Sequence, residues 1–435
     1  MKFASSVRKE LGRQHTIQEL QAGLLHNEIV VYRKNGNRRI KSGAFLKAIN
    51  KIIPKIGVTR VADISYLVAI PFPVFQSCRP NYFMHSSLGQ NSGSQGKGGY
   101  RTQAIISCLM ETIEGYSCEP RNPSLIRASY NFLKNHKLVY PSQKFIHSDK
   151  IKAPTDNEPL MWTPAYCILT KTEVLIPAEL IYFPFLSLDY NTRSIFPSGS
   201  NGLASGSSYL EATIHALYEL IERNYAYFFD IGKIKIEAIY DQELLNKGIL
   251  HFKNKYSNEY EIQFYALELY HTKKNMPLIF CTLVSSTETF TGWGLSSTVD
   301  ISIDRAFSEA IQNMAVHISG TREDLKNDTK CTNYNPFHKT PQPKKRTLRI
   351  NNFRNRVHDK TFKSLNEEYK FILKWLQQLG YNTIFVANLT RVGVDIPVVK
   401  VVIPGFQLPN SLKKTNPVRT HKLIQEMYPN MSSNK

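Results

Sequence analysis

Long apolar segments are missing from this sequence. Its 435 residues contain no run of eighteen or more apolar side chains, so we predict no membrane-spanning helix. The first residues, MKFASSVRKELGRQ, lack the apolar block that follows the basic start of a secretory signal. We therefore expect a cytoplasmic protein.

Paired cysteines are missing as well. The six cysteines are scattered, with no Cys-x-x-Cys pair and no histidine pair nearby at zinc spacing. This spacing argues against a disulfide framework and against a structural zinc site. We expect reduced and mostly buried thiols.

Acidic residues are few compared with basic ones. There are 35 Asp and Glu against 55 Lys and Arg, a formal charge of 55 − 35 = +20. A basic surface attracts polyanions such as nucleic acid, nucleotides or acidic peptides. Because the sequence contains no RNA-recognition aromatic motif and no zinc finger, we interpret the charge chiefly as a solvated surface and predict no dedicated nucleic-acid site.

The two commonest nucleotide-binding motifs are also absent, since we find neither a Walker A loop nor a strand-borne Rossmann fingerprint. Strand-like apolar runs instead alternate with amphipathic helical segments along the whole chain. This alternation predicts a mixed α/β (α+β) fold.

One pattern occurs twice. SQGKGGYRTQAIISCLMETIEGY and SNGLASGSSYLEATIHALYELIERNY each place a glycine-rich stretch before a helix that carries two glutamates three residues apart. Glu111 and Glu114 correspond to Glu219 and Glu222 at one constant offset, 219 − 111 = 222 − 114 = 108. The offset indicates an internally duplicated glycine-loop–helix module, and such repeats often form a pseudo-symmetric site.

The four glutamates lie on the polar stripe of each predicted helix. On a single helix, such a pair would most simply face water. Its repetition at the same phase favours a shared site, where four carboxylates would repel one another without a cation. Mg²⁺ prefers such oxygen ligands and often bridges to phosphates. We therefore predict Mg²⁺ at Glu111, Glu114, Glu219 and Glu222.

The glycine-rich stretches supply backbone N–H groups immediately before helix N-termini. Such positions favour phosphate, and Lys97 adds a positive charge. The sequence therefore predicts a phosphate-binding site next to the metal.

With these motifs the sequence resembles the YcaO-domain family. The resemblance also includes DRAFSEAIQNMAVHISGTRED, GVTRVADIS, IPFPVFQSCRP and VDIPVVKVVIPG. It covers roughly Arg38 to Phe406. We accordingly expect an N-terminal extension (1–37), a YcaO-like ATP-binding catalytic domain (38–410) and a C-terminal tail (411–435).

The resemblance implies an enzyme that uses ATP and Mg²⁺ to activate a peptide backbone amide. A nucleophile attacks the amide carbonyl, the oxyanion attacks ATP, and phosphate leaves with the former amide oxygen. A neighbouring Cys, Ser or Thr side chain then gives an azoline ring, whereas external sulfide gives a thioamide. The substrate would be a ribosomally made peptide.

The resemblance also assigns residues. Ser107, Glu111 and Glu114 match the first family signature, Glu219, Glu222 and Arg223 the second, and Glu309 and Gln312 the third. The four paired glutamates would hold Mg²⁺. The residues expected to contact nucleotide are Lys97, Ser107, Ser207, Glu211, Arg223, Glu309, Gln312 and Arg322.

Three departures from the family pattern affect the interpretation. Gly115 and Met314 stand where arginine is frequent in the family, so phosphate contacts are rearranged. The C-terminus, EMYPNMSSNK, lacks the proline-rich tail of azoline-forming members. This absence weakens the interpretation that the protein forms azoline rings, and it leaves thioamide formation, or another amide activation, more open.

Two alternatives stay open beside the enzyme. One is a non-catalytic nucleotide-binding accessory or scaffold protein of a peptide- or ribosomal-protein-modification complex, and the weaker one is a nucleic-acid-binding protein. We expect a precursor peptide as substrate. We also expect a separate protein that binds the leader peptide or delivers sulfur, because no such domain is evident before Arg38. A homodimer is compatible with the sequence, which leaves the oligomeric state open.

Overall fold

A computed structural model provides the architecture. It describes residues 14–31, 36–80, 93–120, 125–136, 138–145, 152–185, 195–196, 198–230, 232, 234–239, 247–269, 272–286, 288–320 and 347–406. Arg322 and the predicted tail 411–435 lie outside the described residues.

Helices and strands alternate along the chain, as predicted. The helices are α2 (Ile17–Leu25), α3 (Ser42–Asn50), α4 (Arg101–Cys118), α5 (Tyr130–Leu133), α6 (Tyr209–Asp230), α7 (Lys247–Lys255), α8 (Val299–Ser319), α9 (Ile350–Arg356) and α10 (Leu365–Gln378). The strands are β1 (Arg60–Asp63), β2 (Val74–Cys78), β3 (Gly93–Lys97), β4 (Ile126–Ser129), β5 (Pro159–Cys167), β6 (Thr172–Pro177), β7 (Leu203–Ser205), β8 (Ile234–Ile239), β9 (Glu261–Leu269), β10 (Leu278–Val284), β11 (Thr289–Leu295), β12 (Thr347–Leu348), β13 (Phe385–Asn388) and β14 (Val398–Val402).

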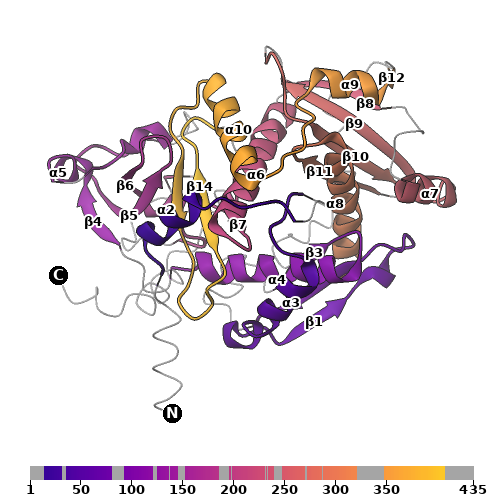
Figure 1. Ribbon diagram of the computed structural model, residues 1–435, viewed down its shortest axis with the longest axis horizontal. Coiled ribbons are helices and arrows are strands. Elements are labelled where there is room, and N and C mark those ends of the chain that lie inside the picture. The colour runs from indigo at the N-terminus through magenta and orange to yellow at the C-terminus, as the bar shows by residue number, and fades with distance from the viewer. Residues whose placement is uncertain are drawn as a thin grey trace.

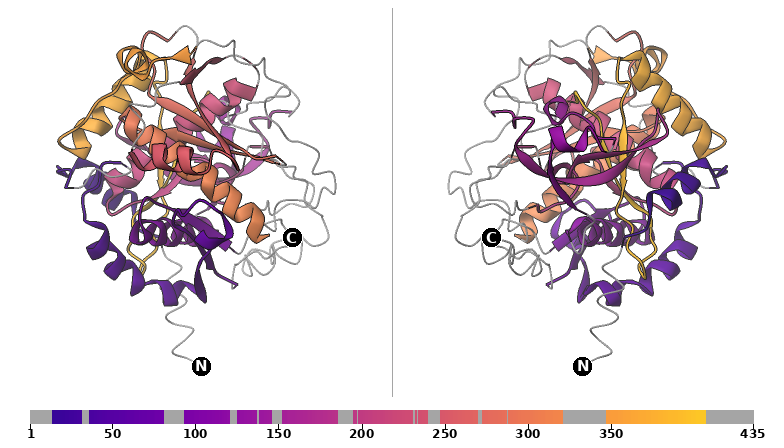
Figure 2. Two further views of the ribbon diagram at one scale, coloured as in Figure 1. Left: turned by 90° about the vertical axis from the view of Figure 1, so that its right-hand side faces the viewer. Right: turned by 90° about the vertical axis from the view of Figure 1, so that its left-hand side faces the viewer.

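The strands form three sheets. Their orders are β1-β2-β3, β11-β10-β9-β8-β12, and β4-β5-β13-β14-β7 with β6 also paired to β5. All of these pairs are antiparallel except β12 with β8. In Figure 1, β4–β6 form a lobe at the left, the β8–β11 sheet lies at the upper right, and β1 with α3 lies at the bottom. Both views in Figure 2 keep the indigo α3 segment at the lower edge.

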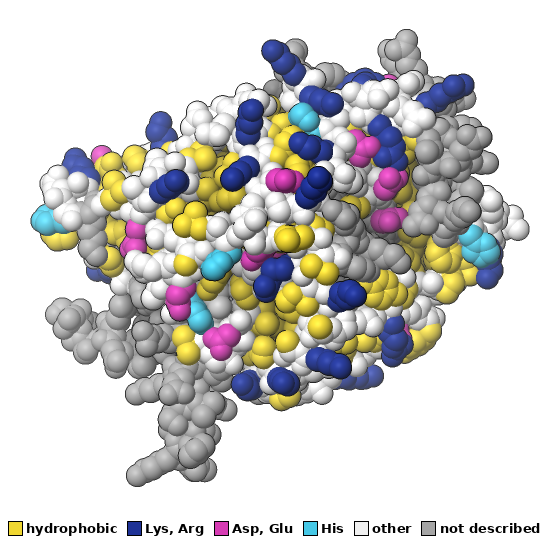
Figure 3. Space-filling model, viewed as in Figure 1, with side chains coloured by type: hydrophobic (Ala, Val, Ile, Leu, Met, Phe, Trp, Pro, Cys, Tyr) yellow, Lys and Arg dark blue, Asp and Glu magenta, His cyan; other side chains and the backbone are white. Residues whose placement is uncertain are grey.

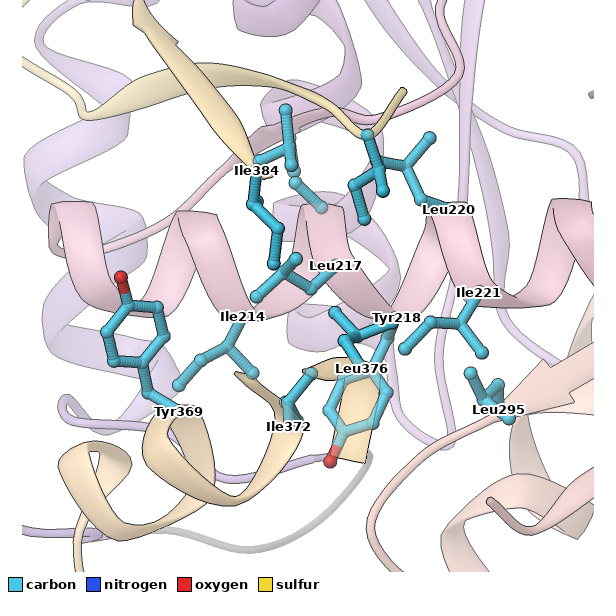
Figure 4. Close-up of a cluster of buried hydrophobic side chains, with 14 of the residues drawn as sticks. Ile214, Leu217, Tyr218, Leu220, Ile221, Leu295, Tyr369, Ile372, Leu376 and Ile384 are labelled. Carbon is cyan, nitrogen blue, oxygen red and sulfur yellow. The ribbon is translucent and has the colours of Figure 1, made fainter. Parts of the chain in front are cut away.

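Helix α6 lies at the centre of the molecule and packs against β14, β7, β11 and α10. Its apolar residues recur every three or four positions, which places them on the buried side of the helix. Figure 4 shows the resulting cluster of α6, α10 and strand residues: Ile214, Leu217, Tyr218, Leu220, Ile221, Leu295, Tyr369, Ile372, Leu376 and Ile384. The helix that carries Glu219 and Glu222 is therefore fixed by the core.

The glycine-rich stretches differ from the prediction, because each is partly a strand. Gly93–Lys97 is β3 and Leu203–Ser205 is β7, so only short turns separate these strands from the helices. The glycines permit close packing: a Cβ atom on Gly96 would lie 2.0 Å from the backbone nitrogen of Cys108 on α4. Part of the glycine signal thus reflects strand–helix contact rather than anion binding.

The first described residues pack into the same core as the rest of the chain. Thr16 and Glu19 form a capping box that starts α2, and Ile17 and Leu20 are buried beside α6. None of the helices in the described ranges is long and apolar enough to cross a membrane.

The remaining expectations from composition concern cysteines and surface charge. The five described cysteines are free thiols, and four of them are buried, as predicted. On the face drawn in Figure 3, Lys and Arg side chains are dispersed over the surface, which agrees with a solvated basic surface.

Candidate functional site

Three strands each precede a long helix and also contact the long helix of another pair, since β3 contacts α8, β7 contacts α4 and β11 contacts α6. β3 leads into α4, β7 into α6 and β11 into α8. Each of the three strands stands at an edge of its own sheet. An edge strand has N–H groups with no strand partner, and these need another acceptor.

We call each strand with the helix that follows it a strand–helix unit: β3 with α4, β7 with α6 and β11 with α8. The first glutamate of each predicted pair accepts a hydrogen bond from within its own unit. Glu111 Oε2 accepts from Gln95 N of β3 at 2.8 Å. Glu219 Oε2 accepts from Gly202 N, directly before β7, at 3.2 Å. Each helix is thereby fastened to the glycine-containing strand that precedes it.

The second glutamate of each pair reaches the next unit. Glu114 Oε1 accepts from the backbone N and the hydroxyl of Ser205 in β7, at 2.8 and 2.6 Å. Glu222 Oε2 accepts from Leu295 N of β11 at 3.2 Å. Glutamates therefore link the three units in sequence, from the first to the second and from the second to the third.

A partly buried ion pair connects the third strand and helix, β11 and α8, back to the first strand, β3. Lys97 Nζ, at the end of β3, lies 2.9 Å from Glu309 Oε2 on α8. We call Glu309 and the four paired glutamates the carboxylate row: Glu111, Glu114, Glu219, Glu222 and Glu309. The row extends across all three helices.

Two arginines stand beside the carboxylate row. Arg223 follows Glu222 on α6, and Arg305 lies one turn before Glu309 on α8. The Nε atom of each is buried and, among the described residues, has no hydrogen-bond partner. A buried donor without a partner is costly, so each nitrogen suits an incoming anion such as phosphate.

The start of α6 is held from the N-terminal side. Ser207 Oγ donates to Glu211 Oε2 at 2.6 Å. Arg38 pairs with Glu211 at 3.2 Å, and Arg39 donates to the carbonyl of Ser207 at 2.7 Å. The predicted residues Ser207 and Glu211 are thus adjacent, and Arg38 and Arg39 are contacts that our sequence analysis missed.

Glu114 and Glu219 hold protons more tightly than ordinary carboxyls. Burial raises the pKa of Glu114 to about 8, and repulsion from Glu219 and Glu111 adds to this, against the lowering by Ser205. Burial likewise raises the pKa of Glu219 to about 7, although Arg223 and Lys400 lower it. Carboxyls that retain protons near neutral pH lack sufficient nearby cations.

Glu222 and Glu309, the two remaining glutamates of the carboxylate row with a shifted pKa, are shifted in opposite directions. Burial and the neighbouring Glu309 raise the pKa of Glu222. Burial also raises that of Glu309, but Lys97 and Arg223 outweigh it and the net pKa is lowered. The row thus combines an ionised, paired carboxylate with carboxyls that a divalent cation would deprotonate. These hard oxygen donors fit Mg²⁺.

Not every predicted residue takes part in these contacts. Ser107 on α4 and Gln312 on α8 make no side-chain hydrogen bond within the described ranges, although they lie one turn from Glu111 and Glu309. Nor do three or more His, Cys, Asp or Glu side chains of the described part form a ready-made metal cluster. The carboxylate oxygens are instead spaced along the strand ends, so the assignment of Mg²⁺ to them stays a prediction.

Two further residues were missed by the sequence analysis. Arg305 precedes Glu309 by four residues, a helical spacing that could have revealed it. Lys400 is the one charged residue of the strand VVKVV, β14, and its isolation among valines was the available signal. Met314, at a position where the family often has arginine, is only 1% exposed and belongs to the core.

The pH dependence of stability tests the surroundings of Glu114. Because its pKa rises from 4.5 to about 8 on folding, the folded protein keeps a proton that the unfolded chain releases. The resulting stabilisation is complete below about pH 4.5 and is lost as the pH rises through about 8. Each pKa unit corresponds to about 1.4 kcal/mol. Without metal or nucleotide, we expect the free energy of unfolding to fall by a few kcal/mol over this range.

Urea unfolding at several pH values measures this decrease. E114Q retains an oxygen that accepts from Ser205 but no longer titrates, so its stability should depend less steeply on pH. The matched control is E259Q, which changes an exposed glutamate and should keep the wild-type slope. Equal slopes for E114Q and the wild type would show that Glu114 titrates normally.

Acidic side chains, partly buried cations and glycine-containing strand ends from three sheets meet at one place, the composition expected for a metal–nucleotide site. Residues 95–407 match the family described as YcaO cyclodehydratase, ATP- and Mg²⁺-binding. The match spans most of the chain, which therefore belongs to the YcaO cyclodehydratase family. The family resemblance is confirmed, as are ATP and Mg²⁺ as the cofactors of the family.

Relatives extend over most of the chain. An uncharacterized protein of Methanothermobacter thermautotrophicus is 26% identical over 385 residues, which cover 85% of this chain and 94% of the relative. The structure of YcaO from Methanopyrus kandleri bound with AMPPCP and Mg²⁺ aligns with a TM-score of 0.67 at 19% identity, covering 89% of this chain and 99% of that one. A heterocyclase in complex with substrate and cofactor aligns with a TM-score of 0.71 at 18% identity, covering 90% of this chain and 55% of that one. The mixed α/β fold is thus YcaO-like.

Proposed function

We propose that this protein activates a peptide backbone amide by ATP- and Mg²⁺-dependent O-phosphorylation, during modification of a ribosomally made peptide. A nucleophile adds to the amide carbonyl, and the oxyanion takes the terminal phosphoryl group of ATP and releases ADP. Phosphate then departs with the former amide oxygen, which is a poor leaving group until it is phosphorylated. The observation that carries this proposal is the carboxylate row with its neighbouring cations, in a chain of an ATP- and Mg²⁺-binding family.

The proposal gives the residues of the row separate roles. Glu111, Glu114, Glu219 and Glu222 hold Mg²⁺, which when bound neutralises charge on the ATP phosphates. Arg223 and Arg305 donate to phosphate oxygens, for which their partnerless Nε atoms are available. Lys97 exchanges its contact with Glu309 for a phosphate contact.

We assign the remaining predicted residues to the nucleotide itself. Ser207 and Glu211 lie together at the start of α6, where backbone N–H groups favour anions. Ser107, Gln312 and Arg322 keep the nucleotide contacts that their family motifs imply. Binding of an ATP analogue to single alanine variants would rank these contributions.

The two strand–helix units that carry the glutamate pairs support an internal duplication. Gly98 and Gly206 are 206 − 98 = 108 residues apart, the same offset as the glutamates. A Cβ atom on Gly98 would lie 2.8 Å from Ala104 N, and one on Gly206 would lie 2.6 Å from Ala212 N. Equivalent glycines thus pack on equivalent alanines, and we propose that one module gave rise to both.

The nucleophile and the partner are part of the proposal. Two nucleophiles fit the proposal: external sulfide, which gives a thioamide, and a neighbouring Cys, Ser or Thr side chain of the peptide, which gives an azoline ring. We also propose a separate protein that binds the leader peptide or delivers sulfur. This chain spans 55% of the length of the heterocyclase that it resembles.

Isotope transfer tests the proposed reaction. The protein is incubated with a precursor peptide whose backbone carbonyls carry heavy oxygen, together with ATP, Mg²⁺ and either no added nucleophile or sulfide. We expect the label to appear in inorganic phosphate, and the peptide to exchange one oxygen for sulfur only when sulfide is present. Loss of one water without sulfide would indicate azoline formation. Phosphate release without label in any peptide would contradict amide activation.

A second candidate is a non-catalytic nucleotide-binding accessory protein. The observation that favours it is Met314, which stands where the family often has an arginine. Met314 is buried in the core, so this position supplies no contact to phosphate. Calorimetry would then detect binding of Mg²⁺ and ATP, with no phosphate released alongside any peptide and partner.

A further inference from the structure

Lys400 is a buried cation in an apolar strand. It lies on β14 between Val399 and Val401, and only 4% of it is exposed. Among the described residues, no carboxylate oxygen comes within 4.0 Å of its ammonium group. Burying an unpaired charge is costly, so stability alone does not explain a lysine here.

The ammonium group of Lys400 binds the turn that precedes β7. Its Nζ donates to the carbonyls of Gly199 and Asn201 at 2.6 and 2.7 Å. Within this turn Leu203 N donates to Ser200 O at 2.8 Å. Gly202 has φ = +78°, the conformation that the third residue of a type II turn requires.

The same peptide group connects Lys400 to the carboxylate row. The carbonyl oxygen of the Asn201–Gly202 peptide accepts from Lys400, and its N–H donates to Glu219 Oε2 at 3.2 Å. A peptide dipole is positive at its N–H end and negative at its oxygen. The cation and the carboxylate therefore lie at the ends of the dipole that each stabilises, although they make no direct ion pair.

Glycine makes this orientation of the peptide one of two that the backbone tolerates. Because a glycine adopts positive and negative φ with similar ease, the Asn201–Gly202 peptide could rotate and carry its N–H away from Glu219. Gly202 O is already held by Val401 N at 2.8 Å. Lys400 holds the preceding carbonyl, so it is the contact that selects the orientation of the N–H.

We propose that Lys400 is a positioning residue of the metal site. It fixes the Asn201–Gly202 peptide so that its N–H orients Glu219 toward a divalent cation. This inference rests on the proposed function, because it takes Glu219 as a ligand of Mg²⁺. Lys400 acts through the peptide and touches neither substrate nor nucleotide.

Titration of Mg²⁺ at a fixed AMPPCP concentration, followed by calorimetry, tests the role of Lys400. Removing a group that orients a metal ligand typically lowers metal affinity by about 10–100-fold. We expect K400M to raise the Mg²⁺ midpoint by at least about tenfold, with AMPPCP affinity at saturating Mg²⁺ close to that of the wild type. K400R should restore most of the loss, because a guanidinium can donate to both carbonyls.

Matched variants separate positioning from folding. V398A removes apolar volume from the same face of β14 and should lower the melting temperature without moving the Mg²⁺ midpoint. K400Q retains an N–H donor without the charge and should give an intermediate shift. If K400M and K400Q both fail to fold while V398A folds, Lys400 is a structural residue and the inference is wrong.

The outcomes distinguish the two proposals. No Mg²⁺-dependent binding of AMPPCP to the wild type would overturn the proposed function, and the role of Lys400 with it. Binding that E219Q weakens and K400M leaves unchanged would overturn only the role of Lys400.

Discussion

Replacing Glu219 and Glu222 together by glutamine should reduce ATP turnover by about three orders of magnitude or more, while the protein stays folded. Single contacts that stabilise charge in a transition state are worth about 10²–10³ in rate, and metal–phosphate positioning dominates phosphoryl transfer. Both side chains accept backbone N–H groups, from Gly202 and Leu295. The oxygen of glutamine can keep these bonds, so the substitution chiefly removes the negative charge that a divalent cation needs.

Release of inorganic phosphate at saturating Mg²⁺ and ATP measures this loss, and the melting temperature reports folding. The single variant E222Q should show a smaller but clear decrease in ATP turnover. Glu222 is only 4% exposed, so water cannot take the place of the lost carboxylate as a ligand. E237Q is the matched control, since Glu237 is a half-buried, ion-paired glutamate on β8, outside the carboxylate row. Full ATP turnover by a folded double variant would show that Glu219 and Glu222 are not ligands of Mg²⁺.

The repeated glutamates could be predicted because helical periodicity is a local property. A constant offset and an apolar stripe suffice to place Glu111 and Glu114 on one face of α4, and the same holds for α6. The mutual repulsion of the carboxylates follows from this pattern, and in the structure it adds to burial, which is the main cause of the raised pKa of Glu114. The family followed from the order and spacing of the motifs, and the mixed α/β fold followed from the alternation of strand-like and helical segments.

The partners of Glu114 and Glu222 could not be predicted, because they come from strands that lie far away in the sequence. Glu114 accepts from Ser205 and Glu222 from Leu295, separations of 91 and 73 residues. Sheet order decides which strands become edges with free N–H groups, and no local pattern specifies it. The role of Lys400 could not be predicted either, since it depends on the contact between β14 and the turn that precedes β7.

The glycine-rich stretches were predicted as loops because glycine is the commonest residue of turns and phosphate loops. In β3, however, Gly96 faces α4 at a distance that a Cβ atom would not allow. Sequence alone does not separate a glycine needed for backbone approach from one needed for an anion. The structure separates the two cases, since Gly96 allows close packing of β3 on α4, whereas Gly202 provides the positive φ of a turn.

Replacing Arg391 by methionine should produce the largest loss of stability, about 2–5 kcal/mol in the free energy of unfolding, because each buried carbonyl left without a donor costs about 1–3 kcal/mol. Arg391 is fully buried with Arg79 and Glu119. Arg79 pairs with Glu119, and Arg391 donates to the carbonyls of Ser117 and Glu119, with Nη2 2.8 Å from Ser117 O. Arg79 thus pairs with the Glu119 side chain, whereas Arg391 binds backbone carbonyls at the end of α4.

The C-terminal end of α4 supplies the remaining negative charge. Its unpaired carbonyls form the negative end of the helix dipole. Arg391 donates to the buried carbonyls of Ser117 and Glu119 at this end, so removing the arginine leaves both carbonyls without this donor. Urea unfolding measures the loss; R101M is the control, because Arg101 is exposed and its pair with Asp63 should contribute no more than about 1 kcal/mol. Since Glu114 lies one turn before this end, a folded R391M should also bind Mg²⁺ and AMPPCP more weakly. An equal, small loss in both variants would show that α4 is held by apolar packing alone.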